Sequence, residues 1–99
     1  MLKITVQKGS GEKVIKLEGK LVQPWIQEFE NAWQELLAAR NGSALIVDLR
    51  SVTYTSEEGK QALRRVHRDG AKLLATGPLM SSIVQQINDE ATKGGNHNG

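Results

Sequence analysis

The segment ALIVDL, residues 44–49, constrains the fold more than any other part of this sequence. It is an almost continuous run of apolar residues, several of them β-branched, and Gly42 and Ser43 precede it as a turn. Such a run is typical of a strand at the centre of a sheet, where both faces of the strand are covered. We therefore expect a central strand here. We expect the neighbouring segments to provide the strands that pair with it and the elements that cover its two faces.

Two further strands are expected before the central one. Apolar and polar side chains alternate in residues 2–8 and again in residues 13–20, which predicts two strands that each turn one face to the core and one to water. The inward positions are Leu2, Ile4, Val6, Ile15 and Leu17. The glycine-rich turn at residues 9–11 joins the two strands, so they are expected to form an antiparallel hairpin.

The apolar spacing then changes to three and four residues, which predicts an amphipathic helix that starts at Pro24 and ends near Asn41 and Gly42. Its apolar stripe consists of Trp25, Ile26, Phe29, Trp33, Leu36 and Leu37. We interpret the aromatic residues of this stripe as core anchors against the sheet. A role in stacking on a ligand is the alternative.

After the central strand we expect a second helix at residues 56–68, a short strand at 71–77 and a third helix from Pro78. The order is β-β-α-β-α-β-α, which predicts an α/β domain with a mixed, mainly parallel sheet. The domain is assigned to residues 1–88. Residues 89–99 lack periodicity and are rich in glycine and asparagine, so they are expected to form a disordered tail.

Composition limits the class of protein. The chain has 99 residues, a formal net charge of +2 and no cysteine, which fits one domain without disulfides. The small charge gives no support to binding of nucleic acid or of an anionic membrane. There is no apolar run of the ~20 residues that a membrane span needs, and no secretory signal. We expect a cytoplasmic protein.

The residue patterns that catalysis requires are not found. His67 is the one histidine within the expected domain, and clustered metal ligands are lacking. The segment GSGEK does not have phosphate-loop spacing, and no serine lies in a nucleophile elbow. We therefore predict no catalytic residues, no metal and no cofactor, and we do not expect an enzyme.

The second helix is basic. Lys60, Arg64 and Arg68 share one face by their spacing of four residues. A solvated helix face explains this pattern, and a docking surface for an acidic partner is the alternative. No aromatic residue is interleaved with these basic groups, which argues against binding of single-stranded nucleic acid.

The segment TSEEG, residues 55–59, lies at the expected start of this helix. Thr55 and Glu58 have the spacing of a capping box, in which the hydroxyl accepts a backbone N–H and the carboxylate reaches back to the Thr55 N–H. Glu57 and Glu58 lie in the first turn, where the helix dipole favours negative charge by ~0.3–1 kcal/mol each. A helix cap is thus one complete explanation of the segment.

Three segments in this order resemble a STAS domain, the module shared by anti-sigma factor antagonists and the cytoplasmic ends of sulphate transporters. They are LEGKL at residues 17–21, ALIVDLRSVTYTSEEGKQAL at residues 44–63 and RDGAKLLATG at residues 68–77. The family pattern at the turn is D-L-x-x-V-x-x-x-D-S-S-G-x-x-x-L. The residues that keep it are Asp48, Leu49, Val52, Gly59 and Leu63.

The departures concern the regulated position. Where the family has Asp-Ser-Ser, this chain has Ser56, Glu57 and Glu58, so the serine that a partner kinase phosphorylates falls at Glu58. The resemblance implies a βα superhelix of the SpoIIAA type, with the turn and the second helix meeting an anti-sigma factor kinase. A glutamate would carry a fixed charge there and could not be cycled. Ser56 and Thr55 remain as alternative phosphate acceptors.

Three hypotheses on function follow. The first is a non-enzymatic protein-interaction module in bacterial regulation, which binds an anti-sigma factor kinase-like or sensor protein. Its partner-binding residues would be Thr55, Ser56, Glu57, Glu58, Gly59, Lys60 and Arg64. The second is a small-ligand or nucleotide-binding STAS-like domain. The two glutamates would repel the phosphate of such a ligand, which argues against this hypothesis. The third is a subunit of a homo-oligomer such as a homodimer, for which the half-exposed hairpin offers a sheet edge.

Overall fold

The computed structural model describes the backbone of residues 1–96 and the side chains of residues 1–92. Its elements follow the order β-β-α-β-α-β-α, as expected from the sequence. They are β1 (Leu2–Lys8), β2 (Glu12–Leu21), α1 (Trp25–Ala38), β3 (Ala44–Thr55), α2 (Glu57–Arg68), β4 (Lys72–Leu74) and α3 (Pro78–Asn96).

The four strands form one mixed sheet in the order β1-β2-β3-β4. β1 pairs with β2 in antiparallel fashion, and the pairs β2/β3 and β3/β4 are parallel. The expected hairpin, the mainly parallel sheet and the interior position of β3 are thus confirmed. Because β2 and β3 are parallel, the loops that follow them emerge at the same edge of the sheet.

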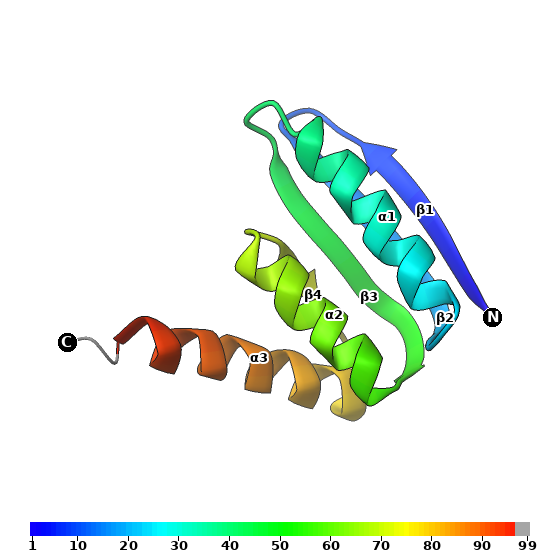
Figure 1. The fold of residues 1–99 in the computed structure, drawn as a ribbon, viewed down its shortest axis with the longest axis vertical. Helices are drawn as coiled ribbons and strands as arrows, with labels where there is room; N and C mark the ends of the chain where they lie inside the picture. Colours follow the sequence, from blue (N-terminus) through cyan, green and yellow to red (C-terminus); the bar gives the residue numbers. More distant parts are fainter. Residues whose placement is uncertain (97–99) are drawn as a thin grey trace.

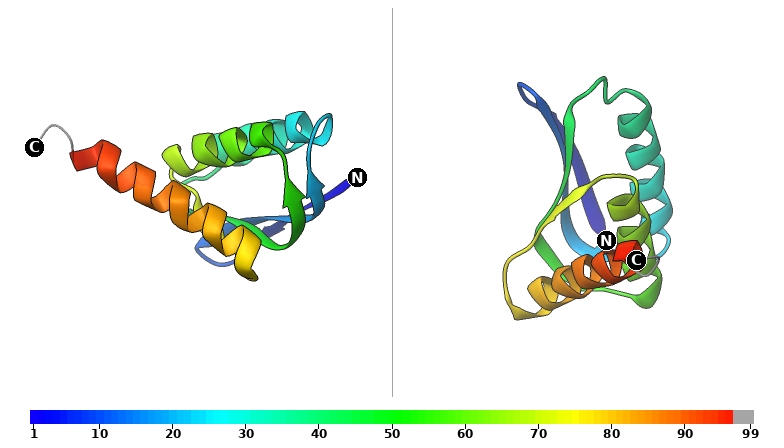
Figure 2. Two further views of the ribbon diagram at one scale, coloured as in Figure 1. Left: turned by 90° about the horizontal axis from the view of Figure 1, so that it is seen from below. Right: turned by 90° about the vertical axis from the view of Figure 1, so that its left-hand side faces the viewer.

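The helices make a second layer. α1 and α2 lie side by side over one face of the sheet, as Figures 1 and 2 show. α3 packs against α2 and β3, and its C-terminal part extends away from the rest of the molecule (Figures 1 and 2). None of the helices within residues 1–96 is long and apolar enough to cross a membrane.

The core lies between the sheet and the helices. Phe29 and Trp33 of α1 are fully buried there, which confirms that they anchor the core, whereas Trp25 is only half-buried. The inward strand side chains Ile15 and Leu17 are also fully buried. The indole Nε1 of Trp33 donates a hydrogen bond to Oδ2 of Asp69 at 3.0 Å, which ties α1 to the end of α2.

The end of α1 and the burial of one strand residue differ from the sequence expectation in the first half of the chain. α1 ends at Ala38 rather than near Gly42, because Asn41 and Gly42 adopt positive φ angles of 49° and 81° in a turn closed by the Ser43 N–H on the Arg40 carbonyl. In β1, Val6 shares the inward face with Leu2, but its side chain is 42% exposed. β1 lies at the edge of the sheet, where α1 leaves that position partly uncovered.

The C-terminal segment also differs. We expected a disordered tail over residues 89–99, but α3 continues to Asn96, and residues 97–99 lie outside the described part of the chain. Side-chain contacts of i,i+4 spacing accompany this part of the helix: Gln85 donates to Asp89, Gln86 donates to Glu90, and Thr92 donates to the Asn88 carbonyl. Residues 88–92 are exposed all round, so a helix here gives no apolar periodicity. The assignment of residues 1–88 as the domain stays a prediction.

Candidate functional site

The candidate site surrounds the start of α2, which we call the α2 entrance and define as residues 54–60. It lies at the sheet edge where β2 and β3 end next to each other, with Leu21 paired to Thr55. The Ser56 N–H donates to the Leu21 carbonyl at 3.1 Å, so the first residue after β3 is still attached to β2. The backbone of the α2 entrance is therefore fixed by the sheet.

Ser56, and not Thr55, caps the helix. The Ser56 hydroxyl accepts a hydrogen bond from the Gly59 N–H at 3.1 Å, and the Ser56 backbone is extended. The capping box that the sequence suggested for Thr55 and Glu58 is therefore wrong. The reason is that β3 continues through Thr55 by pairing with Leu21, which moves the start of α2 by one residue.

Thr55 has a structural role instead. Its side chain is 5% exposed, and its hydroxyl lies 3.3 Å from the Leu21 carbonyl oxygen and 3.1 Å from that of Ser56. Gly59 is buried directly beside it, and a Cβ on Gly59 would lie 2.7 Å from the Leu21 carbonyl oxygen. These two residues support the α2 entrance from beneath and are not open to a partner.

The charged side chains point outward. The Glu57 side chain is 75% exposed, and one of its carboxylate oxygens lies 3.2 Å from Nζ of Lys60. Glu58 is exposed, and no ion pair of its carboxylate is found within residues 1–92. The α2 entrance thus presents one carboxylate paired with a lysine and one carboxylate directed to water.

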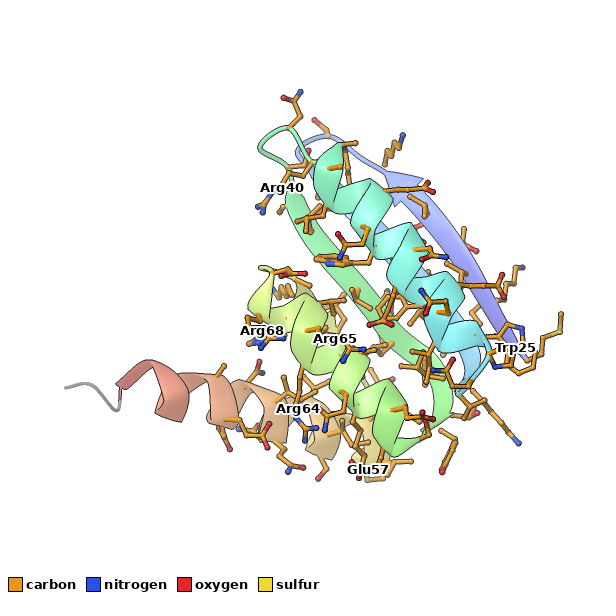
Figure 3. All side chains as sticks on the ribbon, in the orientation of Figure 1. Trp25, Arg40, Glu57, Arg64, Arg65 and Arg68 are labelled. Atoms are coloured by element: carbon orange, nitrogen blue, oxygen red, sulfur yellow. The ribbon has the colours of Figure 1, made fainter. Side chains whose placement is uncertain are left out.

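Arg64 does not belong to this surface. Its Nε donates to Oε1 of Glu90 on α3 at 2.9 Å, and Figure 3 shows it along α2 from Glu57, which lies at the end next to β3. Arg65 forms an ion pair with Glu30 of α1. Two basic side chains of α2, Arg64 and Arg65, therefore take part in contacts that join the three helices.

Sequence reasoning missed the exposed aromatic residue of this site. Tyr54 is 49% exposed and is paired across the sheet with Lys20 at the end of β2. The register of β3 shifts twice against β2, and each time β3 advances one residue further than β2. Such shifts change which side chains face the core, so simple alternation does not identify Tyr54 as an outward residue.

Another charged pair lies away from the α2 entrance. On β3, the guanidinium of Arg50 binds both carboxylate oxygens of Asp48, at 2.9 and 2.8 Å. The hydrogen bond from Arg50 lowers the pKa of the buried Asp48 carboxyl, against the opposing effect of burial. Within residues 1–92, no cluster of three or more histidine, cysteine or acidic side chains is arranged to hold a metal ion.

Comparison with known proteins gives the fold. No family model matches the chain, and no curated protein matches it. Among solved structures, an anti-sigma factor antagonist from Mycobacterium paratuberculosis matches with a TM-score of 0.78 and 20% identity, over 93% of this chain and 82% of that one. The unphosphorylated anti-sigma factor antagonist SpoIIAA matches with a TM-score of 0.67 and 15% identity, over 84% and 82%.

A third structure, the STAS domain of an anti-sigma factor antagonist from Rhodobacter sphaeroides, matches with a TM-score of 0.52 and 20% identity, over 77% and 86% of the two chains. The SpoIIAA-like fold expected from the sequence is therefore confirmed. The chain shares its fold with these three structures. The consequences of a glutamate at position 58 are not tested by these comparisons and stay a prediction.

Proposed function

We propose that this chain is a non-enzymatic protein-interaction module of the anti-sigma factor antagonist type, active in bacterial regulation in the cytoplasm. The observation that carries the proposal is the α2 entrance, where a backbone fixed to β2 presents the exposed side chains of Tyr54, Glu57 and Glu58 together with the half-buried Ser56 and Lys60. The similarity in fold to anti-sigma factor antagonists supports it.

A rigid turn of this kind suits recognition by a protein. The exposed carboxylates and the aromatic ring offer both charge and contact area, and neither needs an ordering step of the backbone before binding. The residues that hold the backbone, Thr55 and Gly59, are buried, so binding and support are divided between different side chains. The partner would present a complementary basic surface, which favours encounter and the choice of partner.

The charge at this surface would be permanent. By the resemblance to STAS domains, Glu58 occupies the position of the phosphorylated serine, and it carries one negative charge where a phosphoserine carries about −1.5 to −2. A partner that recognises this charge would always find the protein in the same charge state. We infer a constitutive interaction with an anti-sigma factor kinase-like or sensor protein, without the reversible step.

The experiment is affinity capture from the native host with matched variants. The tagged protein should retain a kinase-like or sensor protein, and the variant Glu57→Gln/Glu58→Gln should lose most of it. The control Glu12→Gln/Asp89→Asn removes two exposed carboxylates at the start of β2 and on α3, and it should retain the partner. Equal capture by all three proteins would contradict the proposal.

A further inference from the structure

A groove lies on the opposite side of the molecule from α2, between the edge strand β1 and helix α1. Its volume is about 590 Å³. Its lining residues are Val6, Lys8, Ala32, Glu35, Leu36 and Ala39. The groove is mainly aliphatic, and it is the place where Val6, although on the inward face of β1, remains 42% exposed.

The strand beside the groove has one unpaired edge within residues 1–96. β1 pairs only with β2, in a register without shifts from Leu2 to Lys8. It contains no proline and no bulge, which are two of the features that commonly block an edge strand. Its outer N–H and C=O groups are therefore able to pair with another strand.

The two walls of the groove differ in charge. The strand contributes Lys8 to the groove, whereas Lys3 lies on the opposite face of the strand by the alternation of side chains. The helix carries Glu35 and, two turns earlier on the same stripe by its spacing, Glu28. No ion pair of Lys8, Glu28 or Glu35 is found within residues 1–92. A second copy related by a two-fold axis would set its acidic helix wall against the basic strand, and the reverse, in two equal contacts.

The strand sequence is also self-complementary. In an antiparallel pair centred on Thr5, each Val6 lies opposite Ile4 of the second copy, and Thr5 lies opposite Thr5. Each lysine then lies opposite an uncharged residue, Lys3 opposite Gln7 and Lys8 opposite Leu2. A parallel pair in register would place each lysine opposite itself, which is unfavourable.

We propose that the β1 edge and this groove form a homodimer interface, in which two copies pair their β1 strands in antiparallel fashion about Thr5. The two sheets become one continuous sheet, and the α1 helices of both copies flank the seam. The aliphatic groove, with Val6 at its rim, is covered in the dimer. This surface lies apart from the α2 entrance, so the dimer leaves the proposed partner site free.

The first test uses cross-linking, for which a chain without cysteine is well suited. Opposite residues in an antiparallel pair have Cβ atoms about 4.5–5.5 Å apart, which a short bismaleimide spans. Thr5→Cys should cross-link to a covalent dimer at low protein concentration, whereas Thr92→Cys, exposed on α3, should stay monomeric. Equal yields for the two variants would overturn the proposal.

The second test exchanges the charges of the walls and is read by sedimentation velocity over a concentration series. Lys8→Glu and Glu28→Lys/Glu35→Lys should each be monomeric where the unmodified chain is dimeric, because each places like charges across the seam. A mixture of the two variants should restore the dimer, because both walls are then complementary. A monomeric unmodified chain, or dimers in both separate variants, would overturn the proposal.

Discussion

The carbonyl oxygen of Leu21 lies 2.7 Å from the position that a Cβ on Gly59 would occupy, and the Thr55 hydroxyl lies closer still. The end of β2 and the first turn of α2 are therefore in contact through backbone atoms. Only a residue without a side chain fits between them. This contact fixes the direction in which α2 leaves the sheet, and so it fixes the place of the exposed glutamates.

Gly59→Ala is expected to destabilise the fold by about 1–3 kcal/mol, because the added methyl group would overlap with the Thr55 hydroxyl and the Leu21 carbonyl oxygen. The measurement is the free energy of unfolding in urea. Gly9→Ala is the matched control, since a Cβ there would lie no closer than 3.6 Å to its neighbours. If both variants unfold at the same urea concentration, the close approach of Gly59 to Leu21 is wrong.

Ser56→Ala should cost about 1 kcal/mol, within a range of roughly 0.5–2, because the Gly59 N–H loses its acceptor. Ser56→Asp should keep most of the stability, since aspartate caps helices as well as serine does. Thermal unfolding followed by circular dichroism distinguishes the two. A loss of the same size in both variants would mean that the serine acts by something other than its cap.

Asp69→Ala should destabilise the protein by about 1–3 kcal/mol, because the Nε1 group of the buried Trp33 would lose its acceptor. Asp69→Asn keeps an acceptor oxygen and should cost less. Urea unfolding followed by tryptophan fluorescence reports on both variants. An Asp69→Ala variant as stable as the unmodified chain would show that this bond between α1 and the end of α2 is not needed.

The pair of Asp48 and Arg50 predicts a pH dependence. Arg50 lowers the pKa of Asp48 in the folded state, so the carboxylate adds stability above its unfolded pKa of about 3.9. That contribution is lost as the pH falls through the lower folded value. Arg50→Gln should raise the pKa of Asp48 and reduce the stability that is lost when the pH falls. NMR titration of the Asp48 carboxyl carbon measures the shift directly, and an unchanged pKa in Arg50→Gln would contradict it.

Much of the fold follows from the sequence because the spacing of apolar residues indicates which face of a strand or helix is buried against the rest of the protein. The alternation around Ile15 and the unbroken run around Val47 correspond to β2 and β3, whose inward residues are fully buried. A disordered tail is expected from residue 89 because the apolar periodicity of the third helix does not continue there. An exposed helix has no apolar stripe, so periodicity does not mark its end at Asn96.

The site was only partly predictable, for a related reason. The first residue of α2 depends on how far β3 remains paired, and that pairing with Leu21 is distant in sequence from Thr55. A capping box that starts at Thr55 and a serine cap one residue later are compatible with the same local sequence. The orientation of Arg64 toward Glu90 likewise depends on where α3 lies, and spacing within α2 carries no information about it.

The two glutamates at the α2 entrance provide the last prediction. At a helix start each is expected to stabilise α2 by ~0.3–1 kcal/mol through the helix dipole, so Glu57→Gln/Glu58→Gln should lose about 1 kcal/mol of folding free energy. Added salt should shrink this loss, because both side chains are exposed. Chemical denaturation at low and high salt measures it. Since the variant remains folded, a loss of partner in the capture experiment would report on recognition. If neither stability nor capture changes, the acidic pair has no role at this helix.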